Sequence, residues 1–189
     1  MCLLAFFLGD SVEHRVEVRA RLRHCTSHLV HDPLQVVESA WHDFDFIGSS
    51  VVGDFKKHRQ TMHAMVYYMD GVVGSMVAAL KAKGMWENLL WVHQSDNGGP
   101  SFSEDAHSAN NWPLQGSKAS NWQGGIRVNA FVSGGLIKAA ASAMVGKRLT
   151  GFVHVCDWYA TFCARADPSP AEFPFVSPTR DTAHISHTM

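Results

Sequence analysis

The 189-residue sequence predicts an α/β fold in which helices pack against a mainly parallel β-sheet. Between residues 54 and 83, apolar residues recur at spacings of three and four, which is the pattern of an amphipathic helix. Residues 87–95 then form an apolar run of the strand type, and residues 126–133 form a second one. Because a helix followed by a strand is one step of a layered α/β sheet, these observations together favour that class.

The N-terminal part carries the weakest pattern. Residues 1–9 are apolar, but they have no positive charge before the run and no clear cleavage site after it, so they make a poor signal peptide. Residues 10–24 are charged, with only a weak alternation of valine and leucine. We therefore expect residues 1–24 to be an atypical N-terminus without stable order. Residues 25–30 are expected to form a short strand that ends just before His31.

The predicted helix at 54–83 has a methionine-rich apolar stripe. We expect this stripe to face the core, because apolar residues at helical spacing pack a core more often than they form an adaptable binding face. Gly84 suits the C-cap, and Lys81 and Lys83 are favourably placed against the C-terminal end of the helix dipole. The stripe comprises Met62, Met65, Val66, Met69, Val72, Val73, Met76, Val77 and Leu80.

The C-terminal part alternates again and then loses its pattern. After the strand at 126–133, residues 136–151 are predicted to form a connection or a weak helix. Residues 167–189 contain several prolines and no periodicity, which indicates a loop or disorder. The expected organisation is a core domain over residues 25–166, with a proline-rich tail after it.

Composition and net charge limit the kinds of partner that we expect this chain to bind. A hydrophobic content of 46% fits one globular domain with a real core. The net charge of −1 and the absence of a single-sign charge block give no support for binding nucleic acid or an anionic membrane. No run approaches the roughly 20 apolar residues of a transmembrane helix. The four cysteines form no metal-ligand or disulfide framework, and no N-glycosylation acceptor occurs, so the compartment stays open.

Polar residues gather where the strand at 87–95 ends. Asp96 and Asn97 offer a carboxylate and an amide oxygen side by side, and hard cations such as calcium and magnesium prefer such ligands. Gly98 and Gly99 follow and permit close approach of a backbone to a ligand. Ligands of open α/β sheets gather at this edge. The same four residues also make a good turn, so by themselves they leave structure and chemistry about equally favoured.

A second polar loop follows and contains Lys118. Its ammonium is a compact point charge, which suits a tetrahedral oxyanion. Trp112 and Trp122 flank the lysine in sequence. They could stack on an aromatic or sugar group of a ligand, but we expect the loop to pack its own aromatic side chains.

Three blocks in these loops together resemble the type I sulfatases, and most closely the arylsulfatase B-like branch. The blocks are SDNGG, NNWPLQGSK and WQGGIR, and they occur in the order and at the spacing of that family. The resemblance covers about residues 29–165, the middle of a full sulfatase. It implies an alkaline-phosphatase-like α/β domain that is incomplete at its N-terminus. It also implies that Asp96 and Asn97 are ligands of an active-site calcium and that Lys118 contacts the substrate sulfate.

His31 acquires a role only through the same resemblance. A histidine before Asp-Pro is by itself more often a structural or surface residue. Sulfatases, however, carry a His-x-Pro-Leu-Gln segment upstream of the Asp-Asn motif, and this chain has one beginning at His31. The resemblance therefore implies that His31 hydrogen-bonds the sulfate ester. It gives Asp32 no role. It also implies a helix over residues 152–162, in which Asp157 and Trp158 support the structure, so His154 and Asp157 are kept out of the site.

The parts of a sulfatase that perform the chemical step have no match in this sequence. In the family the nucleophile is a formylglycine made from the cysteine of a Cys-x-Pro-Ser-Arg motif, and none of the four cysteines stands in such a motif. The early Asp-Asp pair of the calcium site also has no match. No catalytic nucleophile is therefore predicted, the calcium site is incomplete, and we expect the chain alone to be inactive.

Several functions stay open at this stage. The resemblance implies a sulfuric ester hydrolase of the arylsulfatase type that acts on a small-molecule or glycan sulfate ester. One alternative is a non-catalytic sulfatase-like relic or interaction protein. A weaker alternative is a phosphodiesterase or phosphatase of the same superfamily. The family is mostly lysosomal or secreted, and the sequence leaves the natural ester, the compartment and the oligomeric state undetermined.

Overall fold

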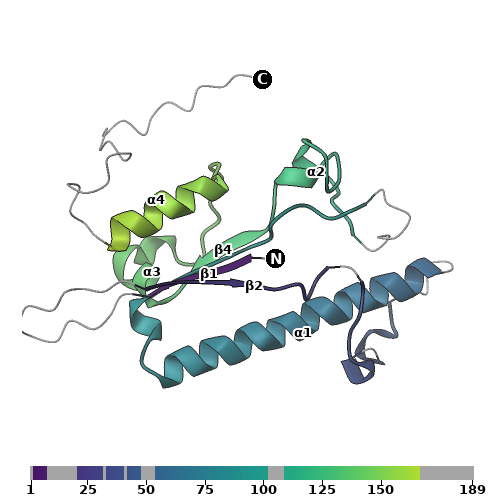
Figure 1. Cartoon of the computed structure of the whole chain (residues 1–189), viewed down its shortest axis with the longest axis horizontal. Helices are drawn as coiled ribbons and strands as arrows, with labels where there is room; N and C mark the ends of the chain where they lie inside the picture. The colour runs from purple at the N-terminus through teal and green to yellow at the C-terminus, as the bar shows by residue number, and fades with distance from the viewer. Residues whose placement is uncertain are drawn as a thin grey trace, which may run out of the picture.

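A computed structural model describes residues 2–7, 21–31, 33–40, 42–47, 54–101 and 109–166. Its centre is a four-stranded sheet, with helix α1 along one face and helices α3 and α4 on the other (Figure 1). The strands are β1 (Cys2–Phe7), β2 (Arg21–Thr26), β3 (Leu89–Gln94) and β4 (Ala130–Ser133). The helices are α1 (Asp54–Ala82), α2 (Gln123–Ile126), α3 (Gly135–Ala140) and α4 (Val155–Ala166). This layering confirms the α/β class.

The strand directions differ from the prediction. The spatial order is β2-β1-β3-β4, and all three pairings among the described strands are antiparallel, so a mainly parallel sheet was the wrong expectation for them. The connection from β3 to β4 explains the direction of that pair. A parallel neighbour needs a crossover that carries the chain back to the other end of the sheet. Here Ser95 N–H donates to the Asn129 carbonyl at 3.1 Å, so the chain returns to the end of the sheet that it left.

Helix α1 confirms the predicted helix and the inward direction of much of its stripe. Met65 and Met69 are buried. The C-terminal half of the helix packs against Leu89 and Trp91 of β3. The contacts from α1 come from Val73, Met76, Val77 and Leu80. Gly84 has a φ of +66° just after the helix, the left-handed conformation that glycine adopts without strain, which explains why the helix stops there.

The opposite face of β3 packs against the C-terminal helices. Leu90 and Val92 form a cluster with Phe162 of α4, and Trp158 lies beside it. The Trp158 indole N–H donates to Gln94 Oε1 at 2.7 Å and ties α4 to the end of the strand. All residues of β3 are buried, because helices cover both faces of this strand. The strand that delivers the chain to Asp96 is thus packed on both of its faces.

Three other boundaries differ from the prediction. β2 begins at Arg21, earlier than the strand expected at 25–30, and β1 also lies within residues 1–24, where no stable order was expected. The strand expected from Ile126 begins only at Ala130, because Ile126 is the last residue of the short helix α2 and residues 127–129 belong to neither a helix nor a strand. Residues 8–20 and the predicted tail at 167–189 lie outside the described residues.

Candidate functional site

The candidate site is built on the long excursion between β3 and β4, residues 95–129. Two backbone hydrogen bonds hold its base. The first is the Ser95–Asn129 bond, and the second joins Gly98 N–H to the Gly125 carbonyl at 2.8 Å. Asp96 and Asn97 lie between these two bonds on the outgoing chain. Since the Ser95 hydroxyl also donates to the Asn97 carbonyl at 2.9 Å, the backbone of this turn is held at both ends.

Close backbone approach explains the glycines of the SDNGG and WQGGIR blocks. A Cβ added to Gly98 would lie 1.8 Å from the Gly124 carbonyl oxygen. A Cβ on Gly124 would lie 2.2 Å from the Gly116 carbonyl oxygen. No side chain fits at such separations, so glycine is required at both positions for the three segments to pack together.

Asn111 holds the two loops together, and sequence reasoning gave it no role. Its side-chain amide donates to the carbonyls of Gly99, at 2.7 Å, and Gly116, at 3.1 Å. Its Oδ1 accepts the Gly99 N–H at 3.0 Å. One partly buried side chain thus satisfies three backbone groups that belong to the turn after β3 and to the lysine loop. Its position in the NNWPLQGSK block is the only signal that could have indicated this role.

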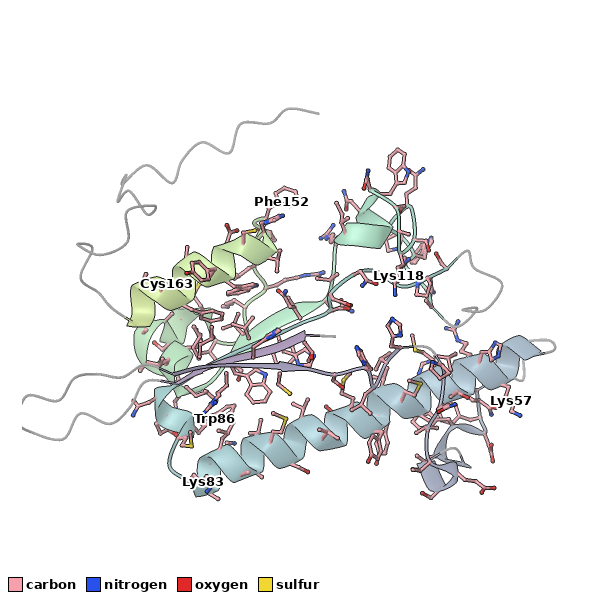
Figure 2. All side chains as sticks on the ribbon, in the orientation of Figure 1. Lys57, Lys83, Trp86, Lys118, Phe152 and Cys163 are labelled. Carbon is pink, nitrogen blue, oxygen red and sulfur yellow. The ribbon has the colours of Figure 1, made fainter. Side chains whose placement is uncertain are left out.

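Two serines set the backbone around Lys118. The buried Ser117 hydroxyl accepts the Ser101 N–H at 2.9 Å, and Ser117 N–H donates to Ser120 Oγ at 3.1 Å. Lys118 N–H donates to the Gly99 carbonyl at 3.1 Å. The lysine backbone is therefore bonded directly to the segment that follows Asp96 and Asn97. Its side chain is exposed at the surface of these hydrogen-bonded loops (Figure 2).

His31 and Lys118 meet although they are 87 positions apart in sequence. Lys118 Nζ lies 3.1 Å from His31 Nε2. An ammonium has no lone pair to offer, so the lysine donates and the imidazole nitrogen accepts. The ring of His28 lies 5.8 Å from that of His31, which brings a second imidazole near the contact. Two potential anion donors thus converge on one exposed point.

Asp96 and Asn97 lie near the base of the excursion, where Asp96 is exposed and Asn97 is half-buried. Their oxygen donors fit the chemistry of calcium, but two donors are far fewer than the six to eight that calcium takes. Within the described part of the chain, no group of three or more His, Cys, Asp or Glu residues could hold a metal ion. At this turn the described structure therefore offers a cation two neighbouring oxygen-bearing side chains.

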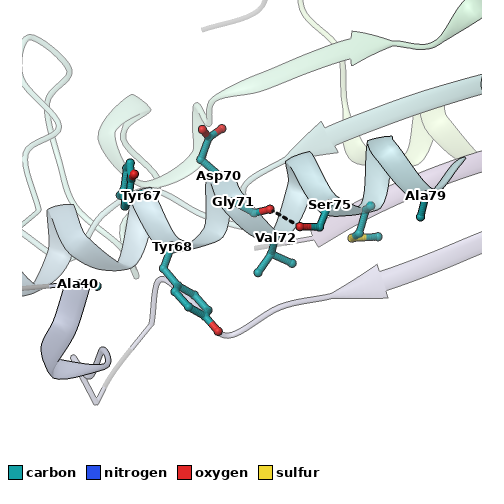
Figure 3. A pocket seen from close by; sticks show the side chains of 9 residues that line it. Ala40, Tyr67, Tyr68, Asp70, Gly71, Val72, Ser75 and Ala79 are labelled. Carbon is teal, nitrogen blue, oxygen red and sulfur yellow. Dashed lines mark hydrogen bonds between the residues drawn. The ribbon is translucent and has the colours of Figure 1, made fainter. Parts of the chain in front are cut away.

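The open groove on α1 is not part of this site. It has a volume of about 750 Å³ and lies against the middle of α1, with Tyr67, Tyr68 and Asp70 among its lining residues (Figure 3). None of the four predicted site residues lines it. Its lining residues include no cationic side chain and one carboxylate, so the groove does not favour a sulfate.

Comparison with known protein families identifies the family of this chain. The family described as Sulfatase matches residues 20–168, which is most of the sequence. The chain belongs to the sulfatase family. The resemblance noted in the sequence is therefore confirmed at the level of the family, and sulfatases act on sulfate esters, generally with a metal ion.

Individual relatives agree with this assignment. Arylsulfatase J from Mus musculus is 33% identical over 138 residues, which are 73% of this sulfatase chain and 20% of the relative. Two crystal structures of Ps i-CgsB, one in complex with k-i-k-neocarrahexaose, are each 34% identical, with TM-scores of 0.60 and 0.59. Each match covers 72% of this chain and 27% of the solved one.

These matches place the chain within a larger architecture. The solved structures and the sulfatase family imply an alkaline-phosphatase-like α/β fold, of which the described sheet and helices are a part. The chain spans between a fifth and about a quarter of the length of these relatives. Among the described residues, no helix is long and apolar enough to cross a membrane.

Proposed function

We propose that this chain forms the anion-binding part of a sulfatase site of the arylsulfatase type. In this proposal His31 and Lys118 hold the sulfate ester, and Asp96 and Asn97 are ligands of a calcium ion. The observation that carries the proposal is the 3.1 Å contact between Lys118 Nζ and His31 Nε2. Two residues that have no local reason to meet, and that the family resemblance separately assigns to sulfate, share one exposed position.

The chemistry of ester hydrolysis explains the value of these groups. Negative charge develops on the leaving oxygen and around the sulfur, so preorganised cations and donors stabilise the transition state. Lys118 supplies a point charge, and His31 supplies a ring nitrogen that can donate to the ester when it carries a proton. Calcium, when bound, adds positive charge beside the sulfate. The Asn111 and Ser117 hydrogen bonds hold the backbone of the lysine loop in place before the ligand arrives.

The chemical step requires a nucleophile, and this sequence contains no Cys-x-Pro-Ser-Arg motif from which a formylglycine could form. Binding groups alone, which hold ground state and transition state about equally, accelerate the step little. We therefore expect the 189-residue chain to bind a sulfate ester and not to turn over a chromogenic aryl sulfate, with or without calcium. Turnover that disappears in a Lys118→Ala variant would show that another residue acts as the nucleophile.

Calorimetric titration with an aryl sulfate in calcium buffer tests the binding proposal. Loss of a charge-assisted contact costs about 1.5–3 kcal/mol, so Lys118→Ala should weaken binding by roughly 10- to 100-fold. Asp96→Ala should remove the effect of added calcium on the affinity. The matched control is Lys83→Ala, which removes an exposed lysine just beyond the end of α1 and should change nothing (Figure 2). Equal losses of affinity in the Lys118 and Lys83 variants would mean that binding of the ester depends only on the net charge of the protein.

The same titration separates the alternatives. A phosphodiesterase or phosphatase site should bind a phosphate ester more tightly than the matching sulfate ester through the same lysine. A relic that retains only the fold should bind neither ester in a Lys118-dependent manner. The NNWPLQGSK block and the sulfatase match over residues 20–168 favour the sulfate ester.

A further inference from the structure

Two tryptophans beside the candidate anion site are exposed, which contradicts the expectation that the loop packs its own aromatic side chains. Trp112 is 84% exposed and Trp122 is 58% exposed. Both belong to the excursion that carries Lys118. An exposed indole leaves a large apolar surface in water, and neighbouring exposed aromatic rings on a binding loop often mark a contact surface.

The backbone that carries both rings is fixed by the same contacts that fix Lys118. Trp112 directly follows Asn111, whose side chain bonds the two loops together. The Trp112 N–H donates to Asn110 Oδ1 at 2.9 Å. The Cβ of Trp122 lies 2.4 Å from the position that a Cβ on Gly116 would occupy, so Trp122 sits against the residue two positions before Lys118. Both tryptophans therefore stand on the same hydrogen-bonded loop as Lys118. A ligand that contacts them would meet rings on a backbone that is already held in place.

The polar and charged surroundings favour a sugar over a purely apolar partner. Gln115 and Asn121 are exposed next to the tryptophans in the same loop. A pyranose ring presents apolar C–H groups on its face and hydroxyls at its edge, so it matches a combination of indole faces and side-chain amides. Among residues 95–101 and 109–129, the cations are Lys118 and Arg127 and the only carboxylate is Asp96, so the described surface offers two cationic side chains to an anionic glycan.

We propose that Trp112 and Trp122 form a stacking platform for sugar rings of a sulfated glycan, next to the sulfate held by Lys118 and His31. This inference rests on the proposed sulfate site and deepens it, because it selects a sulfated saccharide over a small aryl sulfate as the substrate class. The tryptophans are specificity-determining contacts in this arrangement. They make no contribution to the binding of the sulfate group itself.

Affinity measurements with three probes test the platform: a sulfated hexasaccharide of the carrageenan type, its desulfated form, and inorganic sulfate. Trp112→Ala and Trp122→Ala should each weaken hexasaccharide binding by about five- to tenfold, the size expected for one aromatic contact. Both should leave the affinity for inorganic sulfate unchanged. Trp112→Phe and Trp122→Phe should retain most of the hexasaccharide affinity, since an aromatic face remains. The matched control is Phe152→Ala, which removes an 87% exposed aromatic ring near α4 (Figure 2).

The outcomes distinguish the platform from the sulfate site. If the tryptophan variants bind the hexasaccharide as tightly as the wild type while Lys118→Ala weakens inorganic sulfate, the platform is wrong and the proposed function stands. If the tryptophan variants weaken both hexasaccharides while Lys118→Ala leaves sulfate unchanged, the platform stands and the sulfate site falls. If the tryptophan variants change only self-association, the exposed rings form a protein interface and the platform is overturned.

Discussion

His93 shows what burial does to a single residue of β3. Its ring stacks on Phe131 of β4, with centroids 4.6 Å apart and planes 12° apart. Its Nδ1 is buried and makes no hydrogen bond within the described structure. Burial penalises the charged imidazolium, so the pKa of His93 is lowered from its ordinary value of 6.5. The folded protein therefore holds this ring neutral.

The lowered pKa of His93 predicts acid sensitivity. As the pH falls through 6.5, the ring of the unfolded chain takes up a proton that the folded chain rejects, so the free energy of unfolding decreases. Stability from this group is fully present above 6.5 and is lost below it, with a limiting slope of about 1.4 kcal/mol per pH unit. Urea unfolding at several pH values between 7.5 and 5 should show a smaller loss in His93→Phe, which keeps a ring against Phe131. Identical pH dependence in both proteins would contradict this account.

At the scale of the element, glycines in α1 and in the site excursion have opposite roles. Gly74 lies inside α1, and a Cβ added there would meet nothing within 4 Å. Gly125 lies in α2, where an added Cβ would lie 2.3 Å from the Ser120 carbonyl oxygen. A helix-interior glycine with room around it only lowers helix stability, whereas the close approach at Gly125 requires the missing side chain.

This contrast predicts opposite signs for the same substitution. Gly74→Ala should raise the free energy of unfolding by about 0.5–1 kcal/mol, because alanine restricts the unfolded chain and favours the helix. Gly125→Ala should lower it, because backbone must move to admit the methyl group. Chemical denaturation of the two variants beside the wild type measures both effects. Stabilisation by Gly125→Ala would show that the α2 segment does not pack against Ser120 as described.

Elements also show where sequence reasoning succeeds. The helix at 54–82 and the strand at 89–94 follow from local patterns of apolar residues, and the structure contains both. Strand direction is set by contacts far along the chain, such as the Ser95–Asn129 bond, and no local pattern contains them. The sequence predicts the start of β2 too far along the chain. Its residues from Leu22 to Thr26 are exposed, so they show little alternation of apolar and polar side chains.

At the scale of the whole molecule, the candidate site depends on contacts between distant segments. Nothing local links His31 to Lys118, and only the family pattern suggested that they meet. Apart from its place in the NNWPLQGSK block, the sequence gives no sign of the role of Asn111, because its partners are the backbones of Gly99 and Gly116. The matched part spans only about a fifth to a quarter of the length of its relatives.

The central claim is that His31 and Lys118 act on one anion. A double-mutant cycle on the affinity for inorganic sulfate in calcium buffer measures this most directly, with His31→Ala, Lys118→Ala and the double variant compared by calorimetry. Residues that share a ligand and contact each other couple by about 0.5 kcal/mol or more. We therefore expect the double variant to lose clearly less affinity than the two single losses combined. Strictly additive losses, or no loss in His31→Ala, would contradict a shared sulfate site.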